Sequence, residues 1–309
     1  MNPELPRFKD IMDHLKTILV ANTGEIACRL INAAKKLEIR TIAIYTTPDC
    51  ESEHVRLADI AVLLDGEPRA AYIGFLFDTT SFARAAAAAA AGLVFVGPSP
   101  EPIESFGLKH TARDLAVAAG VPVVPGTQGL LETEDAAVDA ANGLGYPVML
   151  KATAGGGGMG LLTCSDEEQV HKNYRTVQSR GESLFKNAGV FLERYYPDSH
   201  HIEVQVFGDG MGKAISIGEH KCSIQRRRQK VIEECPSPFV ELRYPGLRER
   251  LTKCAVSLAE SIKYGSAGTM NTRLQVEHGI TEMCYGVDLV DDFLRRISAS
   301  AKRAPTGAC

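Results

Sequence analysis

The chain has 309 residues, of which 45% are hydrophobic and 23% are charged, and its formal net charge is −4. This length is enough for two or three domains with their own cores. The slightly acidic balance argues against a nucleic-acid partner, and no apolar run is long enough to cross a bilayer. The N-terminal segment mixes acidic and basic side chains without the apolar core of a signal peptide. The eight cysteines are scattered, without the spacing of a zinc site, so we expect reduced thiols in a cytoplasmic protein.

The first hundred residues predict an α/β domain. A short apolar strand at 16–20 is followed by a turn at 22–25, a helix at 26–37 and a second strand at 41–45. A strand, a helix and a second strand form a βαβ unit, so a parallel sheet should begin here. Another buried strand is expected at 93–98.

Beyond residue 100 the pattern predicts helices mixed with strands, and the strands at 190–193, 202–207 and 214–218 are expected to form an antiparallel set. The expected helices are 102–119, 131–142, 248–262 and 286–297. The expected strands are 121–124, 146–152, 190–193, 202–207 and 214–218.

A glycine-rich loop follows the strand that carries Lys151. Four consecutive glycines, Gly155, Gly156, Gly157 and Gly158, would let backbone N–H groups close around phosphate oxygens while the lysine neutralises their charge. Seen alone, the loop fits a flexible linker equally well. The basic run at 225–230 is similarly open to two interpretations, a solvated surface or a contact with phosphate or bicarbonate.

A stretch near the C-terminus alternates polar and apolar residues. Asn271, Arg273, Gln275 and Glu277 would share one face of a strand. A guanidinium can grip an oxyanion and a neighbouring carboxylate can accept a proton, so this face suits a small oxyacid such as bicarbonate. A solvated polar edge strand is the alternative.

Taken in order, these motifs resemble the biotin carboxylase module of biotin-dependent carboxylases, from about Leu15 to Arg296. The stretches that carry the resemblance are 18–27, 54–59, 94–99, Lys151 with its glycine loop, 201–206, 222–227 and 270–278. Within the family, 106–116 and 275–282 look most like urea carboxylase, the carboxylating half of urea amidolyase.

The resemblance implies an α/β fold with two domains. The first, at 13–98, would be a Rossmann-like domain that lacks one βα unit near 73/74. The second, at 99–297, would be an ATP-grasp domain with a lid at about 128–207 and a missing hairpin at 269/270. A polar tail at 298–309 would follow, and the family's C-terminal domain would be absent.

The resemblance also implies roles for individual residues in ATP binding. Lys109, Lys151 and the four glycines would contact the phosphates. The backbone from Glu193 to Tyr196 would form the hinge around adenine. His201 and Gln225 would lie near the ribose and phosphates.

For catalysis, the resemblance implies that Arg273, Gln275 and the backbone of Val276 hold bicarbonate. Glu277 would be the general base, and Lys230 would neutralise charge on the carboxyphosphate intermediate. The implied cofactors are ATP, Mg²⁺ or Mn²⁺, and biotin on a separate carrier domain, and a homodimer is expected.

The sequence departs from the family where a magnesium site is expected. Ser266 to Thr269 run directly into Met270, whereas family members have a hairpin there whose two glutamates bind the metal. Asn271 is the one candidate ligand left. A second hypothesis is therefore a catalytically impaired nucleotide-binding remnant, or an incomplete coding sequence. Half of a carbamoyl-phosphate synthetase, another ATP-grasp enzyme, is a third.

Overall fold

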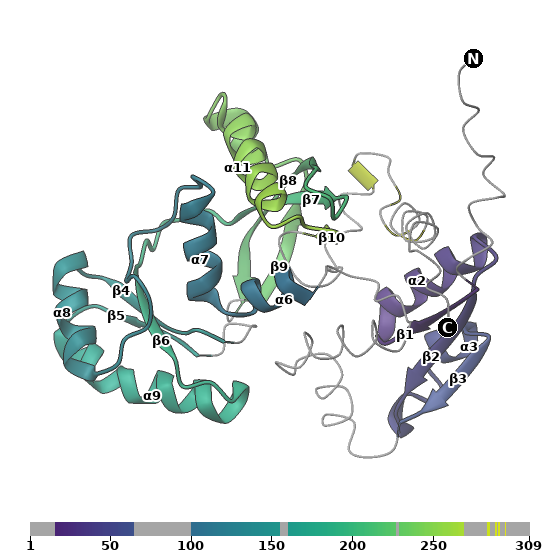
Figure 1. Cartoon of the computed structure of the whole chain (residues 1–309), viewed down its shortest axis with the longest axis horizontal. Helices are drawn as coiled ribbons and strands as arrows, with labels where there is room; N and C mark the ends of the chain where they lie inside the picture. The colour runs from purple at the N-terminus through teal and green to yellow at the C-terminus, as the bar shows by residue number, and fades with distance from the viewer. Residues whose placement is uncertain are drawn as a thin grey trace, which may run out of the picture. The chain divides into compact units, whose positions relative to one another are not determined.

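The computed structural model describes residues 16–64, 100–154, 160–226 and 229–268, with the isolated residues 283, 284, 288, 290 and 294. The chain divides into two compact units (Figure 1), unit 1 with Met1–Val96 and Gly286–Cys309, and unit 2 with Gly97–Tyr285. In the described part of the chain, no helix combines the length and apolarity needed to span a bilayer.

Unit 1 contains a parallel sheet of β1 (Thr17–Val20), β2 (Arg40–Tyr45) and β3 (Ile60–Leu63), in that order. Helix α2 (Gly24–Lys36) connects the first two strands and buries an apolar stripe. The short η2 (Thr47–Asp49) and α3 (Glu53–Leu57) precede β3. The βαβ unit is therefore confirmed, whereas the expected strand at 93–98 lies outside the described residues.

The first sheet of unit 2 has the order β5-β4-β6 and is antiparallel throughout. Its strands are β4 (Val148–Ala152), β5 (Leu161–Cys164) and β6 (Val190–Arg194). Helices α8 (Glu134–Leu144) and α9 (Glu167–Phe185) pack on it and form one apolar core with it. Each helix starts at a capping side chain, Thr133 for α8 and Asp166 for α9, which accepts a hydrogen bond from the first turn.

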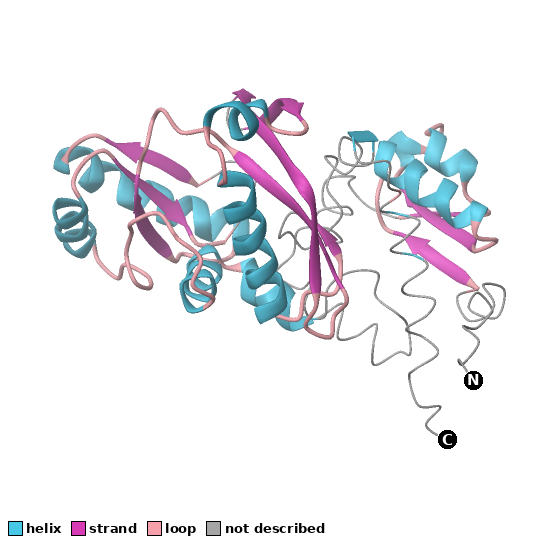
Figure 2. Ribbon diagram, turned by 90° about the horizontal axis from the view of Figure 1, so that it is seen from above, coloured by secondary structure: helices cyan, strands magenta, loops and turns pink. Residues whose placement is uncertain are grey.

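The second sheet of unit 2 has the order β10-β7-β8-β9. Its strands are β7 (Ile202–Gly208), β8 (Ala214–Arg226), β9 (Gln229–Glu234) and the short β10 (Ala267–Gly268). Helix α11 (Leu247–Ser261) packs against β7 and β8, and α10 (Pro238–Arg243) precedes it. The two sheets are separate sets of strands in Figure 2, so the prediction that the strand at 190–193 joins those at 202–207 and 214–218 was wrong: β6 pairs with β4.

Three predicted elements differ from the structure in their extent or type. The predicted helix at 102–119 is two helices, α6 (Pro100–Gly107) and α7 (Lys109–Ala118), because Leu108 between them is extended. The predicted strand at 121–124 is irregular, and its Val121 N–H bonds back to the carbonyl of Ala116. The strand predicted to end at Gly218 continues to Arg226, because the basic run belongs to the β8–β9 pair.

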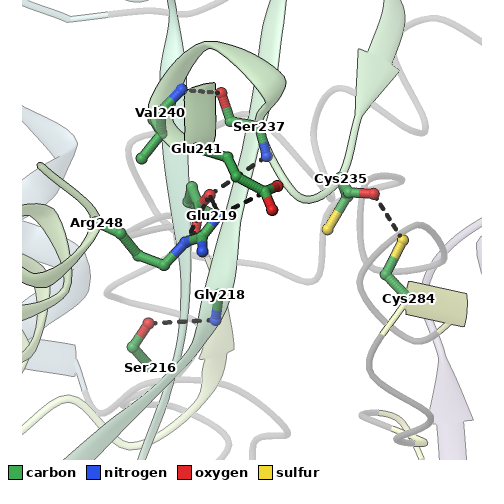
Figure 3. Close-up of polar contacts among 9 residues, drawn as sticks. All are labelled: Ser216, Gly218, Glu219, Cys235, Ser237, Val240, Glu241, Arg248 and Cys284. Carbon is green, nitrogen blue, oxygen red and sulfur yellow. Dashed lines mark hydrogen bonds and ion pairs between the residues drawn. The ribbon is translucent and has the colours of Figure 1, made fainter. Parts of the chain in front are cut away.

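A buried carboxylate fastens β8 to α11 (Figure 3). Glu219 is 1% exposed and accepts three hydrogen bonds of 3.0–3.1 Å from the Arg248 guanidinium. The Ser237 N–H, just before α10, donates to the same carboxylate at 3.3 Å. This one side chain therefore joins a strand to the two helices that follow it.

We expect Arg248→Ala to lower the free energy of unfolding by about 2–3 kcal/mol, because it leaves the Glu219 charge buried without its cation. Denaturant unfolding measures the change. Arg250→Ala, on an exposed position of the same helix, is the control. Equal stability of the two variants would contradict a structural role for this ion pair.

Candidate functional site

A largely buried glutamate on β6 holds two cations from other elements. The Glu193 side chain is 13% exposed, and its two oxygens bond the Lys151 ammonium, on the adjacent strand β4, and the Arg113 guanidinium of α7. Arg113 Nη1 lies 3.1 Å from Oε1. We call Glu193, Lys151, Arg113 and Lys109 the Glu193 cluster.

Lys109 opens helix α7 and lies against the end of strand β4. Its N–H donates to the Thr153 carbonyl at 2.9 Å, and its Nζ donates to the Ala152 carbonyl at 3.2 Å. Burial, and then the charge of nearby Lys151, lowers the pKa of Lys109 to about 8. Two ammonium groups kept this close favour an anion with several charges between them.

The cluster depends on a close approach of the backbone at Gly126. This residue bridges to Glu193. A Cβ at this position would lie 2.6 Å from the Leu192 carbonyl oxygen and 2.9 Å from Glu193 Cγ. Any larger side chain would therefore push β6 and its glutamate out of place.

A second carboxylate organises the strands β7, β8 and β9. Glu203 Oε1 lies 3.0 Å from His201 Nε2 and 2.6 Å from Lys230 Nζ, and Oε2 lies 3.3 Å from His220 Nε2. On the other side of the His201 ring, Nδ1 lies 2.9 Å from Gln225 Nε2. We call these five residues the Glu203 cluster.

Burial alone would raise the pKa of Glu203. The contacts with His201, His220 and Lys230 outweigh it and hold the pKa far below its ordinary value. Glu203 is therefore a fixed negative charge that orients Lys230 and His201.

The structure thus brings together six of the residues predicted from the sequence, in two groups. Lys109, Lys151 and Glu193 lie in one cluster, and His201, Gln225 and Lys230 lie in the other. Tyr196 follows β6 with a half-exposed ring. The remaining predicted residues, Gly155, Gly156, Gly157, Gly158, Asn271, Arg273, Gln275, Val276 and Glu277, lie outside the described residues.

Three residues of these clusters were missed by the sequence reasoning: Arg113, Glu203 and His220. Arg113 and Glu203 each lie within a stretch that carries the family resemblance. The resemblance therefore pointed to these stretches but did not indicate what the two residues contact. His220 has no such signal, since a lone histidine in an alternating strand reads as an ordinary side chain.

Replacing Lys151 with Met should raise the pKa of Lys109 from about 8, but only part of the way, because burial is the larger cause of the shift. An NMR pH titration of the lysine side-chain signals measures this value. Lys172→Met, at an exposed position of α9, should leave it unchanged. A pKa of Lys109 that does not rise in the Lys151 variant would show that the two charges do not interact.

Comparison with known proteins gives two family matches. Residues 14–73 match the biotin carboxylase N-terminal domain, and residues 109–302 match the ATP-binding domain of the carbamoyl-phosphate synthase L chain. A protein named as a urea carboxylase in Emericella nidulans is 62% identical over 93% of this chain and 26% of its own length. A biotin carboxylase of Halalkalibacterium halodurans is 42% identical over 89% of this chain and 68% of its own length.

A solved structure resembles the chain closely. The biotin carboxylase domain dimer of Hydrogenobacter thermophilus 2-oxoglutarate carboxylase, in complex with MgADP, ADP and bicarbonate, superimposes with a TM-score of 0.86 at 38% identity. The match covers 92% of this chain and 69% of that one.

This chain is much shorter than its urea carboxylase and urea amidolyase relatives. The chain spans about a quarter or less of the urea carboxylase and urea amidolyase relatives. The Emericella nidulans alignment extends over 325 residues although this chain has 309, so that protein has residues without a counterpart here.

Proposed function

Because this chain belongs to the biotin carboxylase family, with a Rossmann-like domain followed by an ATP-grasp domain, we propose that it is the biotin-carboxylating module of a urea carboxylase-type enzyme. The observation that carries the proposal is the Glu193 cluster, in which Lys109 and Lys151 form a cationic pair suited to a polyphosphate. The match to the biotin carboxylase N-terminal domain favours this family over a carbamoyl-phosphate synthetase half.

In this proposal, ATP is held by residues of both clusters. Lys109 and Lys151, with Gly155 to Gly158, bind its phosphates, and the backbone from Glu193 to Tyr196 contacts adenine. His201 and Gln225 bind nearer the ribose and phosphates. The ion pairs of Glu193 fix Lys151 and Arg113 before ATP arrives, which reduces the ordering that binding requires.

The reaction then uses the bicarbonate held by Arg273, Gln275 and the backbone of Val276. Glu277 removes its proton, and a bicarbonate oxygen attacks the γ-phosphorus of ATP. The bond to the departing ADP oxygen breaks, leaving carboxyphosphate and ADP. Lys230, ion-paired with Glu203, neutralises charge on that intermediate. Biotin on a separate carrier domain is the carboxyl acceptor, and a homodimer is the proposed assembly.

The residues present do not fit a magnesium site of the expected kind. Magnesium needs carboxylate oxygens alongside the phosphates. The sequence from Ser266, through β10, to Asn271 contains no carboxylate. We therefore assign no step to the metal.

This departure supports a second candidate, a nucleotide-binding remnant that has lost the carboxylation step. Its supporting observation is that the relative's alignment is longer than this chain. The two candidates share the nucleotide site and differ in whether bicarbonate is activated.

The distinguishing experiment is ATP hydrolysis by the purified chain with Mg²⁺ and free biotin, with and without bicarbonate. Bicarbonate-dependent hydrolysis that is lost in Glu277→Gln establishes the carboxylating module. Nucleotide binding without such hydrolysis, in a folded sample, establishes the remnant. A folded sample that binds no nucleotide would contradict both.

Nucleotide affinity should fall as the pH rises through about 8, because Lys109 loses its charge there. Calorimetric titration with ATP measures the effect. Lys109→Arg should remove the pH dependence, since the guanidinium stays charged. Lys109→Met should bind ATP about 10–100-fold more weakly at neutral pH, the loss of one charge-assisted contact.

Unfolding cannot explain such a fall in affinity. The pKa of Lys109 is depressed in the folded chain, so the unfolded chain binds more protons and this residue's contribution to stability rises above pH 8. Affinity that is flat with pH in the unmodified chain would contradict the role of Lys109.

A further inference from the structure

Three side chains with metal-ligand chemistry converge where β7 pairs with β8, two strands that are labelled in Figure 1. The possible ligand atoms of His201, Glu203 and Cys222 all lie within 4.8 Å of one another. Glu203 is directly opposite His220 in the strand register, and the Cys222 N–H donates to the His201 carbonyl. Side chains at alternate positions of paired strands therefore project on one face, as a His-x-Glu segment beside a His-x-Cys segment.

Two buried polar groups at this place lack a hydrogen bond among the described residues. Glu203 Oε2 is one, and the ring of His220, which is fully buried, is the other. They face each other at 3.3 Å, within ion-pair distance but without hydrogen-bond geometry. Buried polar atoms of this kind call for an explanation, and they mark this place as a polar site inside the sheet.

We propose that His201, Glu203 and Cys222 form a binding site for Zn²⁺, distinct from any magnesium that accompanies ATP. Imidazole, thiolate and carboxylate are the three ligand types that proteins use for zinc, and a tetrahedral ion needs ligand atoms separated by about 3.3–3.7 Å. The separation of 3.0 Å between His201 Nε2 and Glu203 Oε1 is already close to this. Mg²⁺ prefers oxygen ligands and would not compete.

The site is accessible from one side and enclosed on the other. The His201 side chain is 49% exposed, whereas Cys222 is fully buried beneath it. On binding, the Cys222 thiol releases its proton to solvent and its sulfur bonds the metal, with no oxidation. Water takes the fourth position, and His220 lies where it can hold the outer oxygen of Glu203.

Bound zinc would affect the nucleotide site, an inference that rests on the proposed function. A zinc ion on His201 Nε2 fixes the ring whose Nδ1 faces Gln225, and it places two positive charges beside Lys230. Since these groups belong to the proposed nucleotide and carboxyphosphate site, bound zinc should weaken nucleotide binding. Zinc would then act as an inhibitor.

The metal site is tested first with Co²⁺ alone, which takes zinc positions and has a visible spectrum. The reduced full chain should bind one Co²⁺ with a thiolate-to-cobalt charge-transfer band, and Zn²⁺ should displace it. The Cys222→Ser variant should lose the band. Cys164→Ser is the matched control, because Cys164 is an equally buried strand cysteine remote from the cluster.

A second pair of variants guards against misfolding of the buried cysteine variant. His201→Ala should weaken cobalt binding by about tenfold or more, while His171→Ala, at a similarly exposed histidine of α9, should not. A band that persists in Cys222→Ser, or equal binding by the two histidine variants, overturns the proposal. So does a folded chain that binds no cobalt.

Inhibition by zinc is measured separately, as the affinity for ATP with and without Zn²⁺. Zinc should weaken ATP binding in the unmodified chain and in Cys164→Ser, but not in Cys222→Ser. Unchanged ATP affinity with the metal bound overturns the inhibitory role. A chain that binds cobalt but no ATP contradicts the proposed function and supports the metal site.

Discussion

Two largely buried carboxylates, Glu193 and Glu203, are the constraint on which the site depends. A buried carboxylate is stable only when cations or donors surround it. Glu193 meets this need with Lys151 and Arg113, and Glu203 meets it with Lys230 and His201. Each glutamate thereby fixes lysine, arginine or histidine side chains from separate elements, and the proposed function assigns several of these side chains to the binding of anionic groups.

The strands supply the precision that the charges require. Glu193 and Lys151 lie on the adjacent strands β6 and β4, and the approach of the chain at Gly126 leaves no room for a side chain. In the other sheet, the pairing of β7, β8 and β9 brings His220 and Lys230 within 3.3 Å of the Glu203 carboxylate. The Glu219–Arg248 pair keeps β8 in contact with α11. Sites on paired strands hold their geometry better than sites on loops.

Much of the fold could be predicted from local patterns. The βαβ unit, β4 and β6 follow directly from apolar runs and turn residues. The errors arose where tertiary contacts override local preference. The extended backbone at Leu108 separates two helices, although the neighbouring residues favour one continuous helix. The basic run after Ile224 pairs as a hairpin, although its composition is typical of a solvated surface.

The site was only partly predictable for the same reason. Lys109, Lys151, Glu193, His201, Gln225 and Lys230 follow from family motifs, because motifs preserve residue types at fixed positions. The juxtaposition of His201, Glu203 and Cys222 has no sequence signal, since the ligands come from two strands paired in space. Spacing rules for zinc describe local loops and therefore miss a site built across a sheet.

The proposed function requires Lys109 and Lys151 to bind the phosphates of ATP. A crystal structure of the chain with a non-hydrolysable ATP analogue tests it most directly. Both Nζ atoms should contact phosphate oxygens, with Glu193 still paired to Arg113. An ordered nucleotide whose phosphates lie away from both lysines would contradict it.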